Sequence, residues 1–476
     1  MAEMLIGGRE VGTERPIRVT NPFDGSVVDT VPSASPAEIE RALATAVEGA
    51  RVMEGLSRRE RARILSEASA LLDERSEDLA TLIAREVGKT IREARAEVAR
   101  AVETFSLSAG EAERLVGEVV PFDAAPTGGD RFGFAIRRPL GVIVAITPFN
   151  FPLNLAAHKV APAIAAGNAV ILKPASATPL ADLELGRILY EAGLPESALS
   201  VVTGPGGEVG GGLVADERPR MVTFTGSAAV GATIARAAGL KRTAMELGSN
   251  SAVIVTEHGD VETAARRSVR GAFALAGQVC ISVQRAIVHE SVAERFVGRA
   301  REVVGALVVG DPLDESTDVG PMIDEGEAER ASEWIREAEA LGGSIVVGGE
   351  RRGALLDPAI LVDTPPEARV WREEAFAPVL VVRPYVTLEE AFAAVNETGY
   401  GLQAGIYTDR LEDALAAAHE IRCGGVMVND VPAFRVDLMP YGGEKGSGLG
   451  REGPRYAVRE MSELRVVAFR RAGVSA

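Results

Sequence analysis

The sequence has few of the residues from which disulfides and metal sites are built. Its 476 residues include only two cysteines, Cys280 and Cys423, and four histidines. Two cysteines cannot form a disulfide framework, and the scattered histidines lack the spacing of zinc ligands. We therefore expect no metal site and a reducing environment for the thiols.

Long hydrophobic runs are also missing. The longest, such as residues 142–146, have the length of a strand rather than of a membrane span. The N-terminal residues lack a basic region followed by an apolar core, so we expect no export signal and a cytoplasmic location.

Positive charge is scarce relative to negative charge. The chain has 51 Lys and Arg residues against 68 Asp and Glu residues, a net charge of −17. Such a surface repels nucleic acids and anionic membranes, so neither is an expected partner. The apolar fraction of 46% is enough to fill more than one core, and the length indicates two to four domains.

Two patterns of hydrophobic residues divide the chain. Residues 35–116 have apolar residues three and four apart, as helices do, and Ser35 and Ser57 are predicted N-caps. Further along, short apolar runs alternate with helical stretches; the runs are residues 142–146, 169–172, 199–202, 221–224 and 252–255. They show little alternation, as in strands buried on both faces, which predicts a parallel, doubly wound sheet. A second α/β pattern runs from about residue 260 to residue 421, so we predict an α/β fold with two such domains.

Two glycine-rich turns follow predicted strands and open predicted helices, where backbone N–H groups can approach a phosphate. Residues 204–210 have the spacing G-x-G-x-x-x-G, one residue longer than the usual dinucleotide fingerprint, and a plain tight turn explains them equally well. Residues 224–227 form the second turn. Residues 88–90 resemble the end of a P-loop, but Ile83 replaces its first glycine and we expect a helix there, so no ATP site is predicted.

Three residues are candidates for chemistry. Cys280 is either a buried, inert cysteine or a nucleophile, which requires a lowered pKa or a nearby base. Glu246 ends a predicted strand at a Gly/Asn turn and is either catalytic or a cap. Lys173 ends another predicted strand and either reaches a ligand at the carboxyl edge of the sheet or extends its head to solvent.

Taken together, seven motifs resemble one family, the NAD(P)-dependent, non-phosphorylating aldehyde dehydrogenases, over nearly the whole chain. Glu246 and Cys280 are separated by 280 − 246 = 34 positions, as in that family. The motifs are Thr147-Pro148-Phe149-Asn150-Phe151-Pro152, Leu172-Lys173-Pro174-Ala175, Phe224-Thr225-Gly226-Ser227, Met245-Glu246-Leu247-Gly248, Gly277-Gln278-Val279-Cys280, Glu373-Glu374-Ala375-Phe376-Ala377-Pro378 and Pro440-Tyr441-Gly442-Gly443.

The resemblance implies a role for each catalytic candidate. Cys280 would attack the aldehyde to give a thiohemiacetal and then a thioester. Asn150 and the backbone N–H of Cys280 would stabilise the oxyanion, and Glu246 would activate the water that hydrolyses the thioester.

The resemblance also implies a nicotinamide cofactor, NADP or NAD. The residues implied to bind it are Thr147, Pro148, Lys173, Ser176, Gly206, Gly210, Phe224, Gly226, Ser227, Gly248, Glu374 and Phe376. Ser176 stands where many members have a glutamate that would repel a 2′-phosphate, so we expect NADP to be accepted and slightly favoured. Ala377 replaces the usual glycine, a small change that should leave the turn intact.

The product and the substrate are less defined. Coenzyme A-acylating members tend to lack a glutamate at position 246, so its presence indicates a free acid as product. Residues 428–440 resemble the substrate loop of members acting on lactaldehyde-like, phosphonate and sulfonate aldehydes; within it, Arg435 would clamp an anionic tail or instead pair with Asp437 or another acid. The same analogy gives an apolar substrate tunnel lined by Phe151, Leu155, Ile281 and Phe434. A coenzyme A-acylating enzyme and a non-catalytic protein with this fold remain alternatives.

A domain plan follows from the same resemblance. We expect a Rossmann-like dinucleotide-binding domain from residues 1–117 and 139–246, a catalytic domain from residues 247–454, and oligomerisation strands within residues 118–138 and 455–476. Residues 130–138 and 464–469 are predicted edge strands free to pair with another subunit. We expect a homodimer or a homotetramer.

Overall fold

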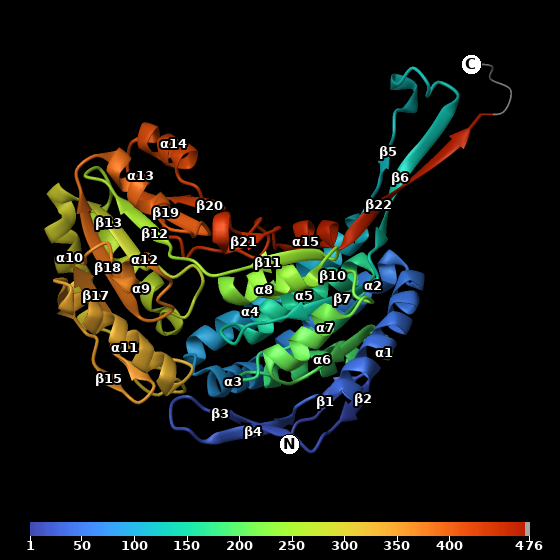
Figure 1. Ribbon diagram of the computed structural model, residues 1–476, viewed down its shortest axis with the longest axis horizontal. Coiled ribbons are helices and arrows are strands. Elements are labelled where there is room, and N and C mark those ends of the chain that lie inside the picture. Colours follow the sequence, from blue (N-terminus) through green and yellow to red (C-terminus); the bar gives the residue numbers. More distant parts are fainter. Residues whose placement is uncertain (472–476) are drawn as a thin grey trace.

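Two parallel sheets, each covered by helices, form the two halves of the protein, and the computed structural model describes residues 1–471 (Figure 1). The first sheet has the order β2-β1-β9-β8-β7-β10-β11-β21. Its five central strands are parallel: β7 (Val142–Ile146), β8 (Ala169–Lys173), β9 (Leu199–Val201), β10 (Met221–Thr225) and β11 (Arg242–Glu246). Antiparallel strands close its edges: β1 (Met4–Ile6), β2 (Arg9–Val11) and β21 (Gly448–Leu449).

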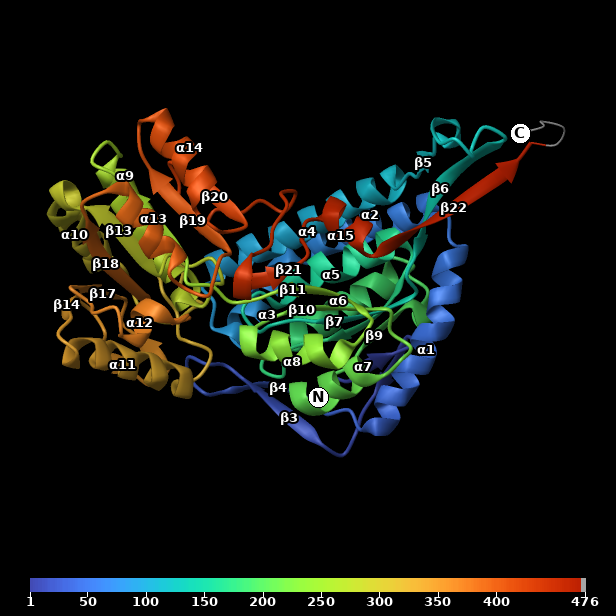
Figure 2. The same ribbon diagram turned by 45° about the horizontal axis from the view of Figure 1, so that its top comes forward.

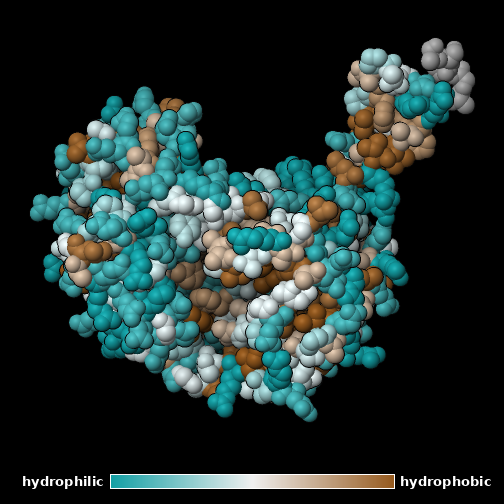
Figure 3. Space-filling view, in the orientation of Figure 1, coloured by the Kyte–Doolittle hydropathy of each residue, from teal (hydrophilic) through white to brown (hydrophobic). Residues whose placement is uncertain are grey.

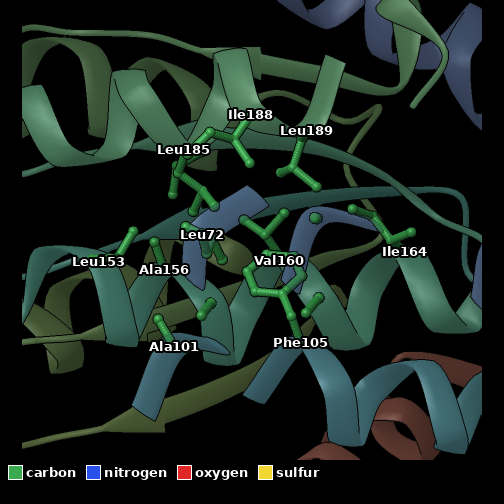
Figure 4. Close-up of a cluster of buried hydrophobic side chains, with 14 of the residues drawn as sticks. Leu72, Ala101, Phe105, Leu153, Ala156, Val160, Ile164, Leu185, Ile188 and Leu189 are labelled. Carbon is green, nitrogen blue, oxygen red and sulfur yellow. The ribbon is translucent and has the colours of Figure 1, made fainter. Parts of the chain in front are cut away.

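Helices cover both faces of this sheet, which explains its continuously apolar strands. Alternate residues of β7 face two different cores, Ile143 and Ala145 one of them and Val142 and Val144 the other. The first core lies under α2 (Arg58–Glu74), α3 (Ser76–Val87), α4 (Ile91–Arg114), α5 (Pro152–Ala166) and α6 (Leu180–Glu191). The side chains labelled in Figure 4 belong to α2, α4, α5 and α6 and pack together. The second lies under α1 (Pro36–Gly55), α7 (Gly211–Ala215) and α8 (Ala228–Ala238).

The second sheet has the order β14-β17-β18-β13-β12-β19-β20 and is parallel except for β14. Its strands are β12 (Ala252–Val255), β13 (Arg285–His289), β14 (Ser344–Val347), β17 (Ala359–Val362), β18 (Val379–Tyr385), β19 (Gln403–Tyr407) and β20 (Gly425–Val428). Its helices are α9 (Val261–Phe273), α10 (Glu290–Gly305), α11 (Glu325–Ala340), α12 (Arg369–Arg372), α13 (Leu388–Asn396) and α14 (Leu411–Glu420). The prediction of two doubly wound α/β units is confirmed.

Smaller elements complete the chain. Two short hairpins are formed by β3 (Pro16–Thr20) with β4 (Val27–Pro32) and by β15 (Arg351–Arg352) with β16 (Leu355–Leu356). α15 (Pro454–Glu460) packs against α5 and α4. Within residues 1–471, no helix combines the length and apolarity needed to cross a membrane.

A three-stranded arm projects from the first half, as Figures 1 and 2 show. It consists of β5 (Glu118–Val119), β6 (Arg131–Pro139) and β22 (Ser462–Arg470), in the order β22-β6-β5. The prediction that both displaced strands are free edges was wrong for β6, because β22 and β5 pair with it on either side. In the described chain, β22 and β5 form the two edges of the arm, and residues 472–476 of the predicted terminal segment lie outside the described residues.

The predicted N-caps of the helical region are confirmed, but the helix predicted over residues 88–90 is not. Ser35 and Ser57 both form capping boxes, with Glu38 and Glu60. The helix expected over residues 88–90 is instead the junction of α3 and α4. Gly88 ends α3 with φ +78° and Thr90 caps α4, because glycine favours the left-handed conformation and threonine the N-cap.

One segment departs from the predicted domain ranges. The two residues of β21 belong to the range predicted as catalytic, but they pair with β11 in the first sheet. This pairing brings the segment around residue 450 next to Glu246. The rest of the division by residue ranges stays a prediction.

Candidate active site

The strand order of the first sheet defines where a ligand can bind. From β7 the chain proceeds to β8 and β9 on one side and returns to β10 and β11 on the other. A crevice opens at the carboxyl ends of the two strands that flank such a switch point. Thr147 follows β7, and Gly226 and Ser227 follow β10, so the fold brings these predicted cofactor residues to one edge.

The turn after β10 fits the pyrophosphate of a dinucleotide. Ser227 caps α8, its hydroxyl accepting a hydrogen bond from the backbone N–H of Val230, so the N-terminus of α8 opens at this edge. Gly226 has no room for a side chain, since a Cβ there would lie 2.4 Å from the ring of Phe224. Only Gly231 and Ala238 of α8 are buried, so most of the surface of this helix is accessible. Apolar side chains line the hollow between the two halves (Figure 3).

Lys173 and Ser176 lie where the adenosine end is predicted to bind. Lys173 is buried at the end of β8, and its ammonium donates to the carbonyl of Pro174 at 2.7 Å. Burial lowers its pKa to about 8, and the charge of Asp182 opposes this shift. Ser176 donates to the carbonyl of Gly204 at 2.9 Å and so joins the loop after β8 to the glycine turn after β9. That turn, residues Gly206–Gly210, is a π-helical turn leading into α7.

Glu374 and Phe376 approach this edge from the second half. Glu374 accepts a hydrogen bond from the backbone N–H of Ser249 at 2.7 Å, and burial raises its pKa to about 7. A Cβ on Gly248 would lie 2.1 Å from this carboxylate, so only glycine fits there. Phe376 meets the ring of Phe149 edge-on, with centroids 5.9 Å apart. The two halves therefore meet at the predicted nicotinamide end.

Cys280 lies in a strained loop after α9. Leu275 and Ala276 have φ values of 48° and 51°, and left-handed backbone at residues other than glycine is strain of a kind typical of functional sites. Gly277 cannot carry a side chain, because a Cβ would lie 2.0 Å from the carbonyl oxygen of Ala377. The Cys280 thiol is half-buried and lies 2.9 Å from the hydroxyl of Tyr441; burial raises its pKa to about 11.

Asn150 contacts the loop that carries the cysteine. Its side-chain amide donates to the carbonyl of Gln278 at 2.8 Å, two residues before Cys280. Within residues 1–471, the backbone N–H of Cys280 has no hydrogen-bond acceptor. Both predicted oxyanion donors therefore lie on one small region.

Glu246, at the end of β11, is almost fully buried. One of its carboxylate oxygens has no hydrogen-bond partner in the described chain, and the other lies 3.0 Å from where a Cβ on Gly442 would be. Burial and the nearby charge of Glu452 raise its pKa well above the ordinary value. A carboxyl with a raised pKa and a free oxygen suits proton transfer.

Two charged groups near Glu246, Glu452 and Lys159, were not predicted from the sequence. Glu452 accepts hydrogen bonds from Lys159 at 2.7 Å and from Arg435 at 3.1 Å, and these two cations lower its pKa to about 2. The signal for Lys159 was present: it is a lysine in the mostly apolar helix α5, all of whose residues are buried. Glu452 gave no signal, since its place depends on the pairing of β21.

The predicted substrate residues are brought together only in part. Ile281 packs with Tyr441 and the cysteine, and Leu155 is buried in α5. Phe151 lies under the ammonium of the buried Lys89. The side chain of Phe434 is 42% exposed and belongs to no buried cluster of the described residues.

Arg435 is buried and does not bind Asp437. Its guanidinium contacts Glu452, lies 3.1 Å from Nε2 of His158, and stacks on the ring of Tyr441 at 3.7 Å from the centroid. Asp437 instead binds Arg100 with both oxygens and lies 2.8 Å from His158. His158 thus lies between Arg435 and Asp437.

Two α/β halves that meet at a crevice of the dinucleotide-binding type, with a cysteine in a loop where they meet, are the arrangement expected of a dinucleotide-dependent dehydrogenase. Comparison with known proteins gives the family. Residues 9–467 match the model of the "Aldehyde dehydrogenase family". The chain belongs to the aldehyde dehydrogenase family.

Individual relatives cover nearly the whole chain. A "3-sulfolactaldehyde dehydrogenase" of Priestia aryabhattai is 45% identical over 98% of this chain and 97% of its own. The structure of aldehyde dehydrogenase 21 from Physcomitrella patens with the product succinate is 39% identical, covers 100% and 99% of the two chains, and superimposes with a TM-score of 0.97. A glyceraldehyde-3-phosphate dehydrogenase of Methanocaldococcus jannaschii in complex with NADP is 39% identical, covers 96% and 100%, and gives 0.93. The predictions of family, fold class, aldehyde oxidation and a nicotinamide cofactor are confirmed.

Proposed function

We propose that the protein oxidises short aldehydes to free carboxylic acids through a covalent intermediate on Cys280. The observation that carries this proposal is the convergence of Cys280, Asn150 and Glu246 where the two halves meet. The effect of the Glu374 and Glu246 carboxylates on the pKa of the thiol, which both raise, supports the proposal.

Each residue then has one task. The thiolate of Cys280 attacks the aldehyde carbon, and the resulting oxyanion accepts hydrogen bonds from Asn150 and the Cys280 backbone. A bound nicotinamide supplies the hydride acceptor. Glu246 takes a proton from water, which hydrolyses the thioester on Cys280 and releases the acid.

We propose that NADP is accepted alongside NAD. Ser176 is neutral and lies in the loop that follows Lys173, so no carboxylate at that position repels a 2′-phosphate. The NADP complex of the relative from Methanocaldococcus jannaschii supports this proposal.

The substrate is proposed to carry an anionic group. Arg435 is a buried cation close enough to Cys280 for its charge to act on the thiol, and its Nε has no partner in the described chain. A guanidinium with spare donors suits a carboxylate or sulfonate. The names of the relatives, which include a sulfolactaldehyde enzyme and a succinate complex, point the same way.

Assembly into a homodimer or homotetramer through β22 is also proposed. The strand keeps one open edge and carries exposed Leu464, Val466 and Phe469. A cytoplasmic location stays a prediction from the sequence.

The test is a panel of short aldehydes with reduced cofactor as the readout. We expect turnover without coenzyme A and the free acid as product. Cys280→Ala should abolish turnover. Glu246→Gln should keep a single burst of reduced cofactor and lose the steady state, whereas activity that requires coenzyme A and survives Glu246→Gln would indicate the acylating alternative.

A further inference from the structure

The half-buried thiol of Cys280 needs a stabilising contact in order to ionise. Attack on an aldehyde requires the thiolate, yet burial raises the pKa of Cys280 to about 11, and the charges of Glu374 and Glu246 raise it further. Among the described residues, the thiol has one hydrogen-bond contact, the hydroxyl of Tyr441 at 2.9 Å. This hydrogen bond and the positive charge of Arg435 both lower the pKa of the thiol.

Tyr441 is held rigidly for this contact. Its backbone exchanges two hydrogen bonds with Glu452, and its side chain is buried against Ile281 and Leu402. The guanidinium of Arg435, itself bound to Glu452, covers one face of the ring. A cation over a phenol ring is attracted to its face and makes the hydroxyl a stronger donor.

The direction of the hydrogen bond follows from the chemistry. A thiolate can only accept, so the phenol must donate once Cys280 has lost its proton. Burial and the neighbouring negative groups raise the pKa of the Tyr441 hydroxyl well above its ordinary value, so the phenol keeps its proton at neutral pH. Tyr441 therefore donates without being consumed, while the thiol proton leaves to water.

We propose that the Tyr441 hydroxyl, 2.9 Å from Cys280 and under the guanidinium of Arg435, is a catalytic hydrogen-bond donor that stabilises the thiolate. The proposal rests on the proposed role of Cys280 as nucleophile. It adds to the proposed catalytic residues a side chain that contacts the reacting sulfur.

The test measures the thiol directly, without aldehyde or cofactor. Wild type, Tyr441→Phe and Tyr407→Phe are alkylated with iodoacetamide over a pH series, and the modification of Cys280 and Cys423 is followed separately by peptide mass spectrometry. Tyr407 is a matched control, because it is buried in the second half and its hydroxyl has no partner in the described chain. Cys423, whose thiol donates to the carbonyl of Gly425, is an internal reference.

We expect Tyr441→Phe to slow alkylation of Cys280 near neutral pH about tenfold and to raise its apparent pKa by about one unit, since hydrogen bonds to charged groups have this strength. Tyr407→Phe and the Cys423 rates should not change. An unchanged pH profile of Cys280 in Tyr441→Phe would overturn the proposal.

A second measurement covers the case in which Tyr441→Phe does not fold. Replacing the six tyrosines biosynthetically with 3-fluorotyrosine makes each phenol a stronger donor with little change in shape. Faster alkylation of Cys280 is expected, and an unchanged rate would contradict the proposal. Failure of the nucleophile role itself is a separate result, since Cys280→Ala would then keep its turnover.

Discussion

Two neighbouring carboxyls illustrate how much a single residue's surroundings decide its chemistry. Glu452 contacts Lys159 and Arg435, which keep it anionic. Glu246 has no such contacts among residues 1–471, and its burial and the charge of Glu452 raise its pKa, so its carboxyl holds a proton more tightly. Glu452 therefore stays anionic, whereas Glu246 is the candidate base.

A pH dependence of hydrolysis follows from this division. Because the pKa of Glu246 is raised, the base form accumulates only as the pH rises, so steady-state acid production should increase with pH while the burst of reduced cofactor is governed by the thiol. Glu246→Gln should lower the steady-state rate roughly 10²- to 10⁴-fold and remove this dependence. Stopped-flow absorbance of reduced cofactor at several pH values separates the two phases. Equal loss of burst and steady state would assign Glu246 another role.

Arg435 should decide which aldehydes are preferred. Arg435→Lys keeps the positive charge but not the planar fork, so kcat/KM for an aldehyde with a terminal carboxylate or sulfonate should fall about 10- to 100-fold relative to a neutral aldehyde of equal length. Taking the ratio of the two substrates cancels any effect on the thiol. Arg352→Gln, at an exposed hairpin, is the control. A ratio equal to that of wild type would remove Arg435 from the substrate site.

The buried ion pair between Lys159 and Glu452 connects α5 to the segment between β21 and α15. Lys159→Met leaves a buried carboxylate without this cation, so the free energy of unfolding should drop by about 3–5 kcal/mol. Because Glu452→Gln also deprives the buried Arg435 of its anionic partner, the compensating variant is the triple Lys159→Met/Glu452→Gln/Arg435→Met, which should recover part of the loss since none of the three buried charges is then left unpaired. Urea denaturation followed by circular dichroism gives both values, and a triple variant no more stable than Lys159→Met would contradict this account.

The same elements show what the sequence could and could not predict. The strands β7, β8 and β10 were predictable because both of their faces are buried, which gives continuous apolar runs. The two-residue strand β21 has no such pattern, and its place depends on pairing with β11. The contacts of Tyr441 and Glu452 follow from that placement, so the residues around the thiol could be found only in three dimensions. The catalytic candidates Cys280, Glu246 and Asn150 were found through motifs, and the structure brings their segments together.

The three-stranded arm carries an edge strand, β22, with exposed apolar side chains. β22 pairs with β6 along its entire length, extends away from the body, and leaves one edge without a neighbouring strand in residues 1–471 (Figures 1 and 2). Apolar side chains are exposed along it, as the brown atoms of the arm show (Figure 3). An exposed apolar edge of this kind favours pairing with a second copy about a twofold axis.

Charges placed on β22 should therefore dissociate the assembly. Leu464 and Val466 lie two residues apart and point to the same face, so Leu464→Glu/Val466→Glu puts like charges into the proposed contact. Sedimentation velocity should show a dimer or tetramer for wild type and a monomer for this variant, with circular dichroism and the burst of reduced cofactor retained. Arg465→Gln, on the opposite face of the strand, should sediment as wild type does. A wild-type monomer at micromolar concentration, or a double variant of unchanged mass, would show that β22 does not join subunits.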